Sequence, residues 1–594
     1  MKYPMLNEMG ASRQMIEVFG GYNHNLRIGD GEFFDMRNMT SNYYPVLSPR
    51  GERGVYATLP DNPQGLIAKD ALCYVRGSKF FINHYPIDMG LSTDEEDCPK
   101  QLVSIGAYVI IMPDKMWINT ANWDGKIFHE ENGYGRIEAS FHSTEDVRFQ
   151  LCTVDGAEHV DTDVSPDEPP DPQNMDYWLD TSSIPNTLKQ FSASSGMWVN
   201  IATTYIKISS PGIGASFKQH DGVKISGIVL EDLKGLNDTM IVWACADDYI
   251  VVVGMLDSVL VQEAEQGSIS VERQMPNMDF IIESENRLWG CKYGVAANGE
   301  VVNEIYASKL GDFKNWNCFM GISTDSYAAS CGTDGQFTGA ITHLGYPLFF
   351  KENCVHKVYG NYPANFQIQT TTCRGVQRGC EKSLAIVNEI LYYKARSGVC
   401  AYDGSLPVEK SYVMGDQLYE NAVAGAHGNK YYISMQDTAG DYHLFVYDTS
   451  KAVWHKEDNL QADAFCACRD DLYCIEHQTK KIITMLGSGE KDTDPVEWMV
   501  ETGEIGISSP DMKYISRLTI RMSMAIGAEV AFYAQYDRSD IWEPLFTLVG
   551  SNLRSFSLPI RPKRCDYMRL RIEGVGDVKI YSITKTIEEG SELS

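Results

Sequence analysis

The strongest candidate for a metal site is a cluster of three cysteines and one histidine, Cys466-x-Cys468-x5-Cys474-x2-His477. In an extended chain Cys466 and Cys468 lie on one face, and a turn brings Cys474 back, so a Cys3His zinc site fits the spacing. The same alternation directs both thiols into a core, where cysteine behaves as a small hydrophobic residue. No cysteine pair here has the spacer of about two to four residues that zinc knuckles use. We therefore expect structural thiols, with no metal and no cofactor.

Carboxylates occur in adjacent or alternating pairs, which is the residue type that a glycosidase needs on the two sides of its scissile bond. They are Asp247 with Asp248, the run 94–97, and Glu283 with Glu285. Solvated turns and polar strand faces explain such pairs equally well. The sequence lacks the sialidase-type pattern Ser-x-Asp-x-Gly-x-x-Trp, and it also lacks Gly-x-Ser-x-Gly, His-Glu-x-x-His and Gly-Lys-Ser/Thr. We expect no catalytic residues and a protein that is not an enzyme.

Two tryptophans, Trp178 and Trp198, are the candidate contacts for a glycan, because indole rings present a large flat apolar surface with a polar tip. Each also lies in a short β-type segment, as a core residue commonly does. Both interpretations of this pair remain open.

The elements around these residues repeat along the chain. Residues 428–458 alternate as strand, Gly/Asp turn, strand, turn and a last strand that ends on Trp454, which predicts a three-stranded meander. Similar stretches begin near residues 65, 278, 335, 383 and 462, and we extend the first of them to Val109–Met112. About six units of roughly 40 to 50 residues have the spacing of propeller blades. The sequence predicts an all-β chain built on a β-propeller of about six blades.

The meander pattern stops between residues 131 and 276. This segment holds the acidic, Pro-rich run 160–172, which we expect to be an extended linker, with β segments on both sides. It reads as a β-rich domain inserted into a propeller loop. After residue 496, Leu518, Ile520 and Met522 alternate with polar residues, which predicts a β-sandwich with one dry face. The expected domains are 1–130 (N-terminal segment and first blades), 131–276 (insert), 277–495 (remaining blades) and 496–594 (C-terminal sandwich).

Net charge and the length of the apolar runs argue against nucleic acid and membrane as partners. The chain has 51 Lys and Arg against 80 Asp and Glu, a formal net charge of −29, which argues against holding nucleic acid through neutralised phosphates. Its longest apolar runs, such as residues 249–256, have the length of a strand, so we expect no membrane insertion. The first 21 residues contain no apolar run of a signal peptide, so we expect synthesis in the cytoplasm. Fifteen scattered cysteines in a chain of 594 residues indicate reduced, buried thiols.

Short motifs at both ends of the chain resemble those of tail proteins of double-stranded DNA phages. The motifs are Phe19-Gly-Gly-Tyr22, Ile28–Asp35, Arg37-Asn-Met39 and Leu47-Ser-Pro-Arg-Gly51 near the start, and Pro562–Asp566, Met568–Gly574, Ile580–Ile583 and Glu588–Ser591 near the end. Arg50 is followed directly by Gly51, where the family pattern has a residue between them. Together with the meanders, they are most similar to the packaged-DNA stabilisation, or tail nozzle, proteins of short-tailed phages.

This resemblance implies a structural virion protein, made in the host cytoplasm, that forms a cyclic homo-oligomeric ring below the portal. Its partners would be other copies of itself, the portal or adaptor, and other tail proteins. An acidic lumen repels phosphates, so DNA would pass through it without specific binding. The alternative is a receptor-binding or baseplate protein that binds a host-surface glycan through its propeller loops or its inserted domain. A depolymerase ranks third.

Overall fold

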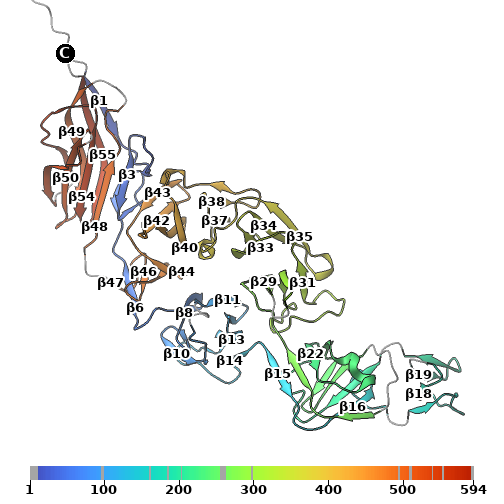
Figure 1. Ribbon diagram of the computed structural model, residues 1–594. Helices are drawn as coiled ribbons and strands as arrows, with labels where there is room; N and C mark the ends of the chain where they lie inside the picture. Colours follow the sequence, from blue (N-terminus) through green and yellow to red (C-terminus); the bar gives the residue numbers. More distant parts are fainter. Residues whose placement is uncertain are drawn as a thin grey trace, which may run out of the picture. The chain divides into compact units, whose positions relative to one another are not determined.

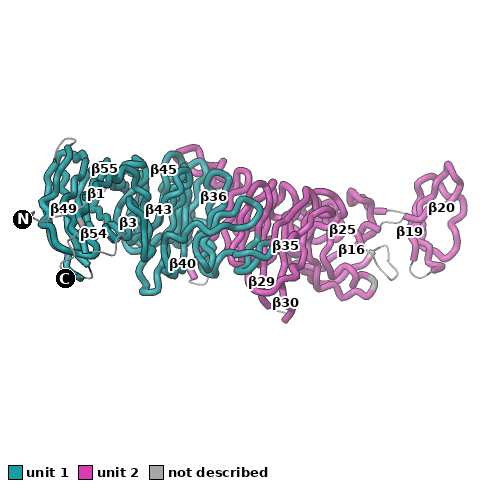
Figure 2. Tube along the Cα trace, turned by 90° about the horizontal axis from the view of Figure 1, so that it is seen from above, with its two compact units in different colours: residues 1–93, 349–355, 371–594 teal, residues 94–348, 356–370 magenta. Residues whose placement is uncertain are grey.

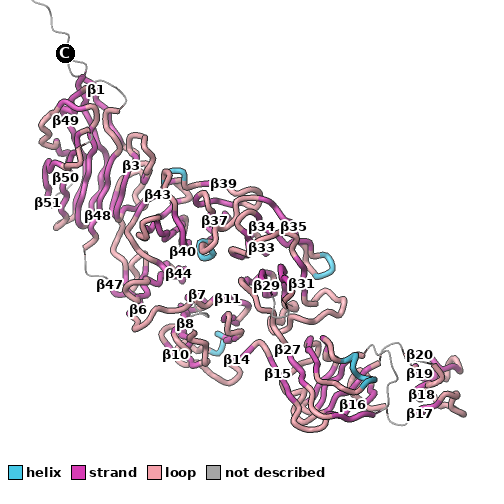
Figure 3. The backbone as a smooth tube through the Cα atoms, viewed as in Figure 1, coloured by secondary structure: helices cyan, strands magenta, loops and turns pink. Residues whose placement is uncertain are grey.

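The structure, a computed structural model, describes residues 11–589 except 95–98, 160–161, 184–185, 202–203, 255–262, 296–298, 492–494, 508–511, 538 and 551–553. Its regular structure is almost entirely β (Figures 1 and 3). The described residues form no α-helix, only short 3-10 turns: η2 (Thr120–Asn122), η3 (Glu231–Leu236), η4 (Pro363–Asn365), η5 (Glu381–Ser383) and η6 (Tyr412–Met414). None of the described helices is long and apolar enough to cross a membrane.

The chain divides into two compact units (Figure 2). Unit 1 holds Met1–Thr93, Phe349–Val355 and Thr371–Ser594, and unit 2 holds Asp94–Leu348 and His356–Thr370. The propeller blades are distributed over both units, the insert lies in unit 2, and the C-terminal strands lie in unit 1.

Seven sheets in the described chain have the antiparallel strand order of propeller blades, which confirms the all-β propeller. In chain order, the first four are β7 (Gly65–Lys69), β8 (Ala71–Arg76), β9 (Lys79–Ile82), β10 (Tyr85–Asp88); β11 (Gln101–Ile105), β12 (Tyr108–Met112), β13 (Met116–Asn119), β14 (Tyr134–Arg136); β28 (Phe280–Ser284), β29 (Arg287–Val295), β30 (Val301–Ala307), β31 (Tyr327–Ser330); and β32 (Gly339–His343), β33 (Tyr346–Lys351), β34 (Cys354–Tyr359), β35 (Gln367–Thr372). The others are β36 (Ala385–Val387), β37 (Ile390–Ala395), β38 (Gly398–Tyr402), β39 (Val408–Glu409); β40 (Tyr419–His427), β41 (Lys430–Asp437), β42 (Tyr442–Asp448), β43 (Val453–Lys456); and β44 (Ala462–Cys468), β45 (Asp471–Glu476), β46 (Lys481–Thr484) with β6 (Gly54–Thr58) and β47 (Glu490–Lys491).

The described residues form seven such sheets where the sequence predicted about six blades. The stretch that we took as one meander from residue 65 to Met112 contains two sheets, because β10 closes the first sheet before β11 opens the second. β10 carries Pro86 at the edge of its sheet, where a residue without an N–H is tolerated, and this proline concealed the strand from the sequence pattern. The last blade is completed by β6, which pairs antiparallel with β46 although more than 400 residues separate them.

Central strands of the blades are buried on both faces. In β41, the five residues from Tyr431 to Met435 are all buried; four of them are apolar, and the fifth, Ser434, donates a hydrogen bond to the Leu460 carbonyl. β37 has the same pattern from Leu391 to Ala395. Blades that stack on both sides of a sheet remove both of its faces from water, which explains why aromatic and β-branched residues dominate these strands.

The insert is built on two sheets that enclose one core. One sheet contains β15 (Ala139–His142), β27 (Ser270–Arg273), β22 (Gly222–Ser226) and β23 (Thr239–Ile241); the other contains β24 (Ala244–Ala246), β25 (Tyr249–Val253), β21 (Tyr205–Ser209), β16 (Val147–Cys152) and β26 (Glu263–Gln266). Phe149, Ile208, Val223 and Ile250 belong to this core. The first and last strands pair directly, with Ala139 opposite Arg273, so the chain enters and leaves the insert at adjacent positions.

A third, smaller sheet extends from the insert: β17 (Asp163–Ser165), β18 (Tyr177–Asp180), β19 (Thr187–Ser192) and β20 (Met197–Asn200). The expectation that residues 160–172 form only an extended linker is wrong for part of this run. Asp163–Ser165 pairs in parallel with β18, because extended, β-compatible residues such as Val164 gain a ladder of backbone hydrogen bonds there.

The remaining strands form a terminal sandwich that contains both ends of the described chain. One sheet has β1 (Ala11–Ile16), β55 (Val578–Glu589), β49 (Lys513–Met524) and β52 (Arg554–Ser557), with β53 (Arg564–Cys565) beside β49. The other has β2 (Gly21–Tyr22), β3 (Glu32–Arg37), β48 (Glu497–Thr502), β54 (Met568–Val575), β50 (Glu529–Tyr536) and β51 (Glu543–Val549). A short ladder, β4 (Met39–Thr40) with β5 (Ser48–Pro49), leads toward β6.

The N-terminal strands therefore do not lie with the first blades, where we expected them. β1 pairs along its whole length with β55, from Ala11 opposite Glu588 to Ile16 opposite Ile583. β3 pairs with β48, and Phe33 and Trp498 are fully buried in the sandwich. This pairing joins residues more than 450 positions apart, so no local pattern in the sequence predicts it.

Candidate functional sites

The Cys/His cluster is not brought together by the fold. Cys466 and Cys468 face the core shared with Leu72 and Tyr74, whereas Cys474 lies on the opposite face of the same sheet. The ring Nδ1 of His477 lies 2.9 Å from the Asp463 carboxylate. Burial raises the pKa of the Cys466 thiol to about 12, which disfavours the thiolate that binds metals. Within the described residues, no group of three or more His, Cys, Asp or Glu side chains is arranged to hold a metal ion.

The two candidate glycan contacts do come together, but as a packed cluster. The Trp178 and Trp198 rings lie 5.5 Å apart in a T-shaped arrangement on one face of the small sheet, and Phe191 lies 5.4 Å from Trp198. Trp178 is only 6% exposed, its Nε1 donates to the Ser165 carbonyl, and Lys189 Nζ lies 4.5 Å above its ring. The ring face of Trp178 on which a sugar would stack is therefore covered by the protein's own side chains.

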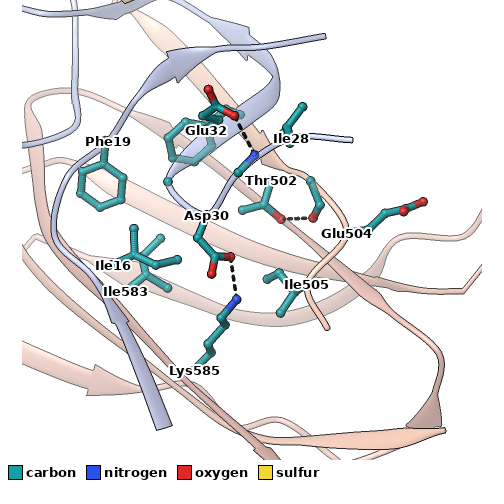
Figure 4. Close-up of a pocket in the computed structure, with 14 residues that line it drawn as sticks. Ile16, Phe19, Ile28, Asp30, Glu32, Thr502, Glu504, Ile505, Ile583 and Lys585 are labelled. Atoms are coloured by element: carbon teal, nitrogen blue, oxygen red, sulfur yellow. Dashed lines mark hydrogen bonds and ion pairs between the residues drawn. The ribbon is translucent and has the colours of Figure 1, made fainter. Parts of the chain in front are cut away.

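Sequence reasoning missed a pocket at the terminal sandwich, between the N-terminal loop 28–32 and the C-terminal strands (Figure 4). Its walls are apolar and include Ile16, Phe19, Ile28, Ile505 and Ile583. Figure 4 shows Asp30 and Lys585 joined across the same pocket, whereas Glu32 bonds within its own loop. The signal that could have found it is the motif beginning at Ile28, which supplies one wall.

Two acidic side chains of this pocket stabilise the N-terminal loop, and one of them pairs with a lysine of β55. Lys585 Nζ lies 2.6 Å from Asp30 Oδ1, and the lysine side chain is only 4% exposed. Glu32 Oε2 accepts hydrogen bonds from the Gly29 N–H at 2.7 Å and from Asn23 Nδ2 at 2.9 Å. Because these carboxylates are satisfied by fixed donors, the arrangement stabilises the loop and does not present the paired acid and base of a glycosidase.

A second cluster joins the N-terminal segment to the blade that ends in β43. Arg53 Nη2 lies 2.7 Å from Glu457 and its Nη1 lies 2.7 Å from Asp458. Arg50, from the motif Leu47–Gly51, donates from Nε to Asn38 Oδ1 at 2.9 Å and lies 3.4 Å from Asp458. Burial alone would raise the pKa of Asp458, but the two guanidinium groups hold it below its ordinary value. The cluster borders a polar cleft that Glu476, Lys481 and Glu497 also line.

Comparisons with known proteins give structural neighbours only. No family model matches the chain, and no curated protein matches it. An exo-β-1,3-galactanase from Phanerochaete chrysosporium aligns at 8% identity over 51% of this chain and 94% of that chain, with a TM-score of 0.22. A glycoside hydrolase family 43 arabinoxylan arabinofuranohydrolase from Bacillus subtilis aligns at 8% identity over 51% and 94%, with a TM-score of 0.19. A Trypanosoma rangeli sialidase aligns at 8% identity over 96% of both chains, with a TM-score of 0.20.

Our expectation that the chain is not an enzyme is contradicted by these comparisons, since the three neighbours named above are glycan-cleaving enzymes. We withdraw that expectation. At such identities and TM-scores the likeness carries no argument about a substrate or about particular residues.

Proposed function

We propose that the protein is a structural component of a phage tail, of the nozzle or DNA-stabilisation type, which forms a ring that retains and conducts DNA. One observation carries this proposal: the motifs at the two ends of the chain that resemble tail proteins fold against each other in a single sandwich. The motifs are separated by most of the sequence, but the fold brings them together in one domain, where they can serve one function.

Direct contacts between the motifs support this interpretation. Leu47, from the N-terminal motif Leu47–Gly51, and Ile580, from the C-terminal motif Ile580–Ile583, exchange both backbone hydrogen bonds, at 3.1 and 2.9 Å. Asp30, from the motif Ile28–Asp35, pairs with the buried Lys585 of β55. These contacts act as structural anchors, as expected of a structural virion component.

The charge of the chain is suited to a conduit. A surface with a formal net charge of −29 per copy repels phosphates, so DNA in an acidic lumen moves past it without being held. In this proposal the ring contacts the portal or adaptor on one side and further tail proteins on the other.

The proposal is tested by locating the protein in virions. Phage particles that carry a C-terminal tag on this chain are labelled and imaged by electron cryomicroscopy. We expect the label in a ring around the tail axis, directly below the portal. A label confined to the tip or the periphery of the tail would contradict the proposal and would favour the receptor-binding alternative.

A further inference from the structure

Positive charge is concentrated in one part of this acidic chain. Residues 513–585 contain 12 Lys and Arg against 7 Asp and Glu, whereas the whole chain has 51 against 80. Most of this segment forms strands β49 to β55 of the terminal sandwich. The excess of positive charge in the sandwich favours contact with a negatively charged partner.

Three exposed arginines lie on the outer face of the sheet β1-β55-β49-β52. The register places Arg13 and Arg517 on either side of Thr586, in one row across the sheet, and Arg521 four residues further along β49. With strands about 4.8 Å apart and a rise of about 3.3 Å per residue, their Cα atoms span roughly 10 to 16 Å. Leu518 and Ile520 point the other way, into the core.

Hydroxyl groups fill the positions between these arginines, namely Thr519, Ser555, Ser557, Ser582, Thr584 and Thr586. Arg517 donates from Nε and Nη2 to Ser557 Oγ, at 3.2 and 3.0 Å, which fixes its guanidinium on the face. Among the described residues, Arg13, Arg517 and Arg521 make no ion pair, and Glu588 is the acidic residue that shares their face, in the row of Tyr514 and Arg564. We call these three arginines and their hydroxyl neighbours the basic face.

A strongly acidic stretch lies in the insert. Residues 149–188 contain nine Asp and Glu and neither Lys nor Arg. Asp163, Asp167, Glu168 and Asp171 are exposed on β17 and the turn that follows it, and they make no ion pair within the described part of the chain. Four prolines between residues 166 and 172 stiffen this stretch, which we call the acidic loop (163–171).

We infer that the basic face of one copy binds the acidic loop of a second copy of this chain. Two copies that each carry −29 repel one another overall, so association is favoured where the local charges are opposite, and these two surfaces supply such a place. The contact is heterologous: it leaves a free acidic loop on one copy and a free basic face on the other, and it closes into a ring when the rotation between copies permits. This deepens the proposed function, on which it relies only for ring closure.

Charge exchange between the two surfaces tests the inference with purified full-length protein, by mass photometry and sedimentation at low and high salt. The wild type should form oligomers that weaken as salt screens the contact. Arg517→Glu/Arg521→Glu should bind a second copy roughly tenfold to hundredfold more weakly, and so should Asp167→Lys/Glu168→Lys. All four positions are exposed, so circular dichroism and melting temperature should not change.

Mixing the two variants gives the decisive result. Each variant keeps one intact surface, and the two reversed surfaces also attract each other, so a 1:1 mixture should yield dimers and larger oligomers that neither variant forms alone. A chain with all four substitutions should regain oligomers for the same reason. A wild type that stays monomeric at low salt, or a mixture that stays monomeric, would overturn the inference. So would wild-type binding of duplex DNA that Arg517→Glu/Arg521→Glu abolishes while self-association persists, since the basic face would then serve nucleic acid. None of these outcomes depends on DNA retention in particles.

Discussion

Arg53 is held between two carboxylates, and removing its charge should be among the most damaging single changes in the chain. Its side chain is 11% exposed and lies 2.7 Å from both Glu457 and Asp458, whose side chains are 8% and 26% exposed. Arg53→Met keeps most of the volume but leaves two largely buried carboxylates without their main partner. Breaking a buried pair in this way costs about 3 to 5 kcal/mol, so we expect a loss of that size in the free energy of unfolding at pH 7.

The pH dependence of this loss identifies its cause. In the wild type the pKa of Asp458 is held down, so its stabilisation is complete above about pH 4 and is lost as the pH falls through the folded value. In Arg53→Met the main cation that lowers the pKa of the Asp458 carboxyl is gone, so burial raises this pKa above that of the unfolded chain. The folded variant then binds more protons than the unfolded chain as the pH falls, so its deficit relative to wild type should shrink between pH 7 and pH 5.

Urea unfolding at both pH values, followed by circular dichroism, measures the two effects. Arg37→Met is the matched control, because the Arg37–Glu497 pair is 3.5 Å long and its side chains are 51% and 70% exposed. Such a pair contributes at most about 1 kcal/mol. Equal losses in the two variants, or a loss from Arg53→Met that is as large at pH 5 as at pH 7, would refute the reasoning.

Three further changes have defined outcomes. Deleting residues 140–272 and joining the ends with a short Gly/Ser linker should leave a folded, mostly β protein, because the strands at the two ends of the insert pair with each other; loss of the β circular dichroism signal would contradict this. Burial lowers the pKa of His455 to about 3, so the unfolded chain binds more protons below about pH 6.5 and stability should fall as the pH drops from there. His455→Gln should flatten that slope in melting curves, and an unchanged slope would show that other groups cause it. Trp178→Ala should cost the small sheet about 3 to 5 kcal/mol, seen as faster amide exchange confined to its strands, whereas the more exposed Trp198→Ala should cost less; equal protection in both variants would disprove the packing role.

Local alternation was sufficient to predict the blades and the C-terminal strands. β41 and β42 were evident because apolar residues alternate between tight turns, and Leu518, Ile520 and Met522 marked the dry face of β49. β1 was missed because its residues are nearly all exposed, so it carries no apolar pattern, and its partner β55 lies at the far end of the chain. Long-range pairing is decided by tertiary contacts that a sequence window does not contain.

Candidate sites were predicted less well than strands. Spacing alone placed Cys466, Cys468 and Cys474 together, but the pleat of β45 turns Cys474 to the other face. Asp30 and Lys585 form an ion pair across the terminal sandwich, which requires knowing that both ends of the chain share one domain. For the basic face, the sequence indicated only that arginines lie on the solvent-facing side of one strand. The extent of this face depends on the register of four strands, which the sequence does not give.

The retention of packaged DNA tests the proposed function most directly. Particles assembled without this protein are purified after packaging, and their DNA content is measured by nuclease protection over time. If the protein is a tail component that retains DNA, these particles should package a full genome and then lose it, and added wild-type protein should restore retention. Particles that keep their genome without the protein but fail to adsorb to cells would contradict the proposal.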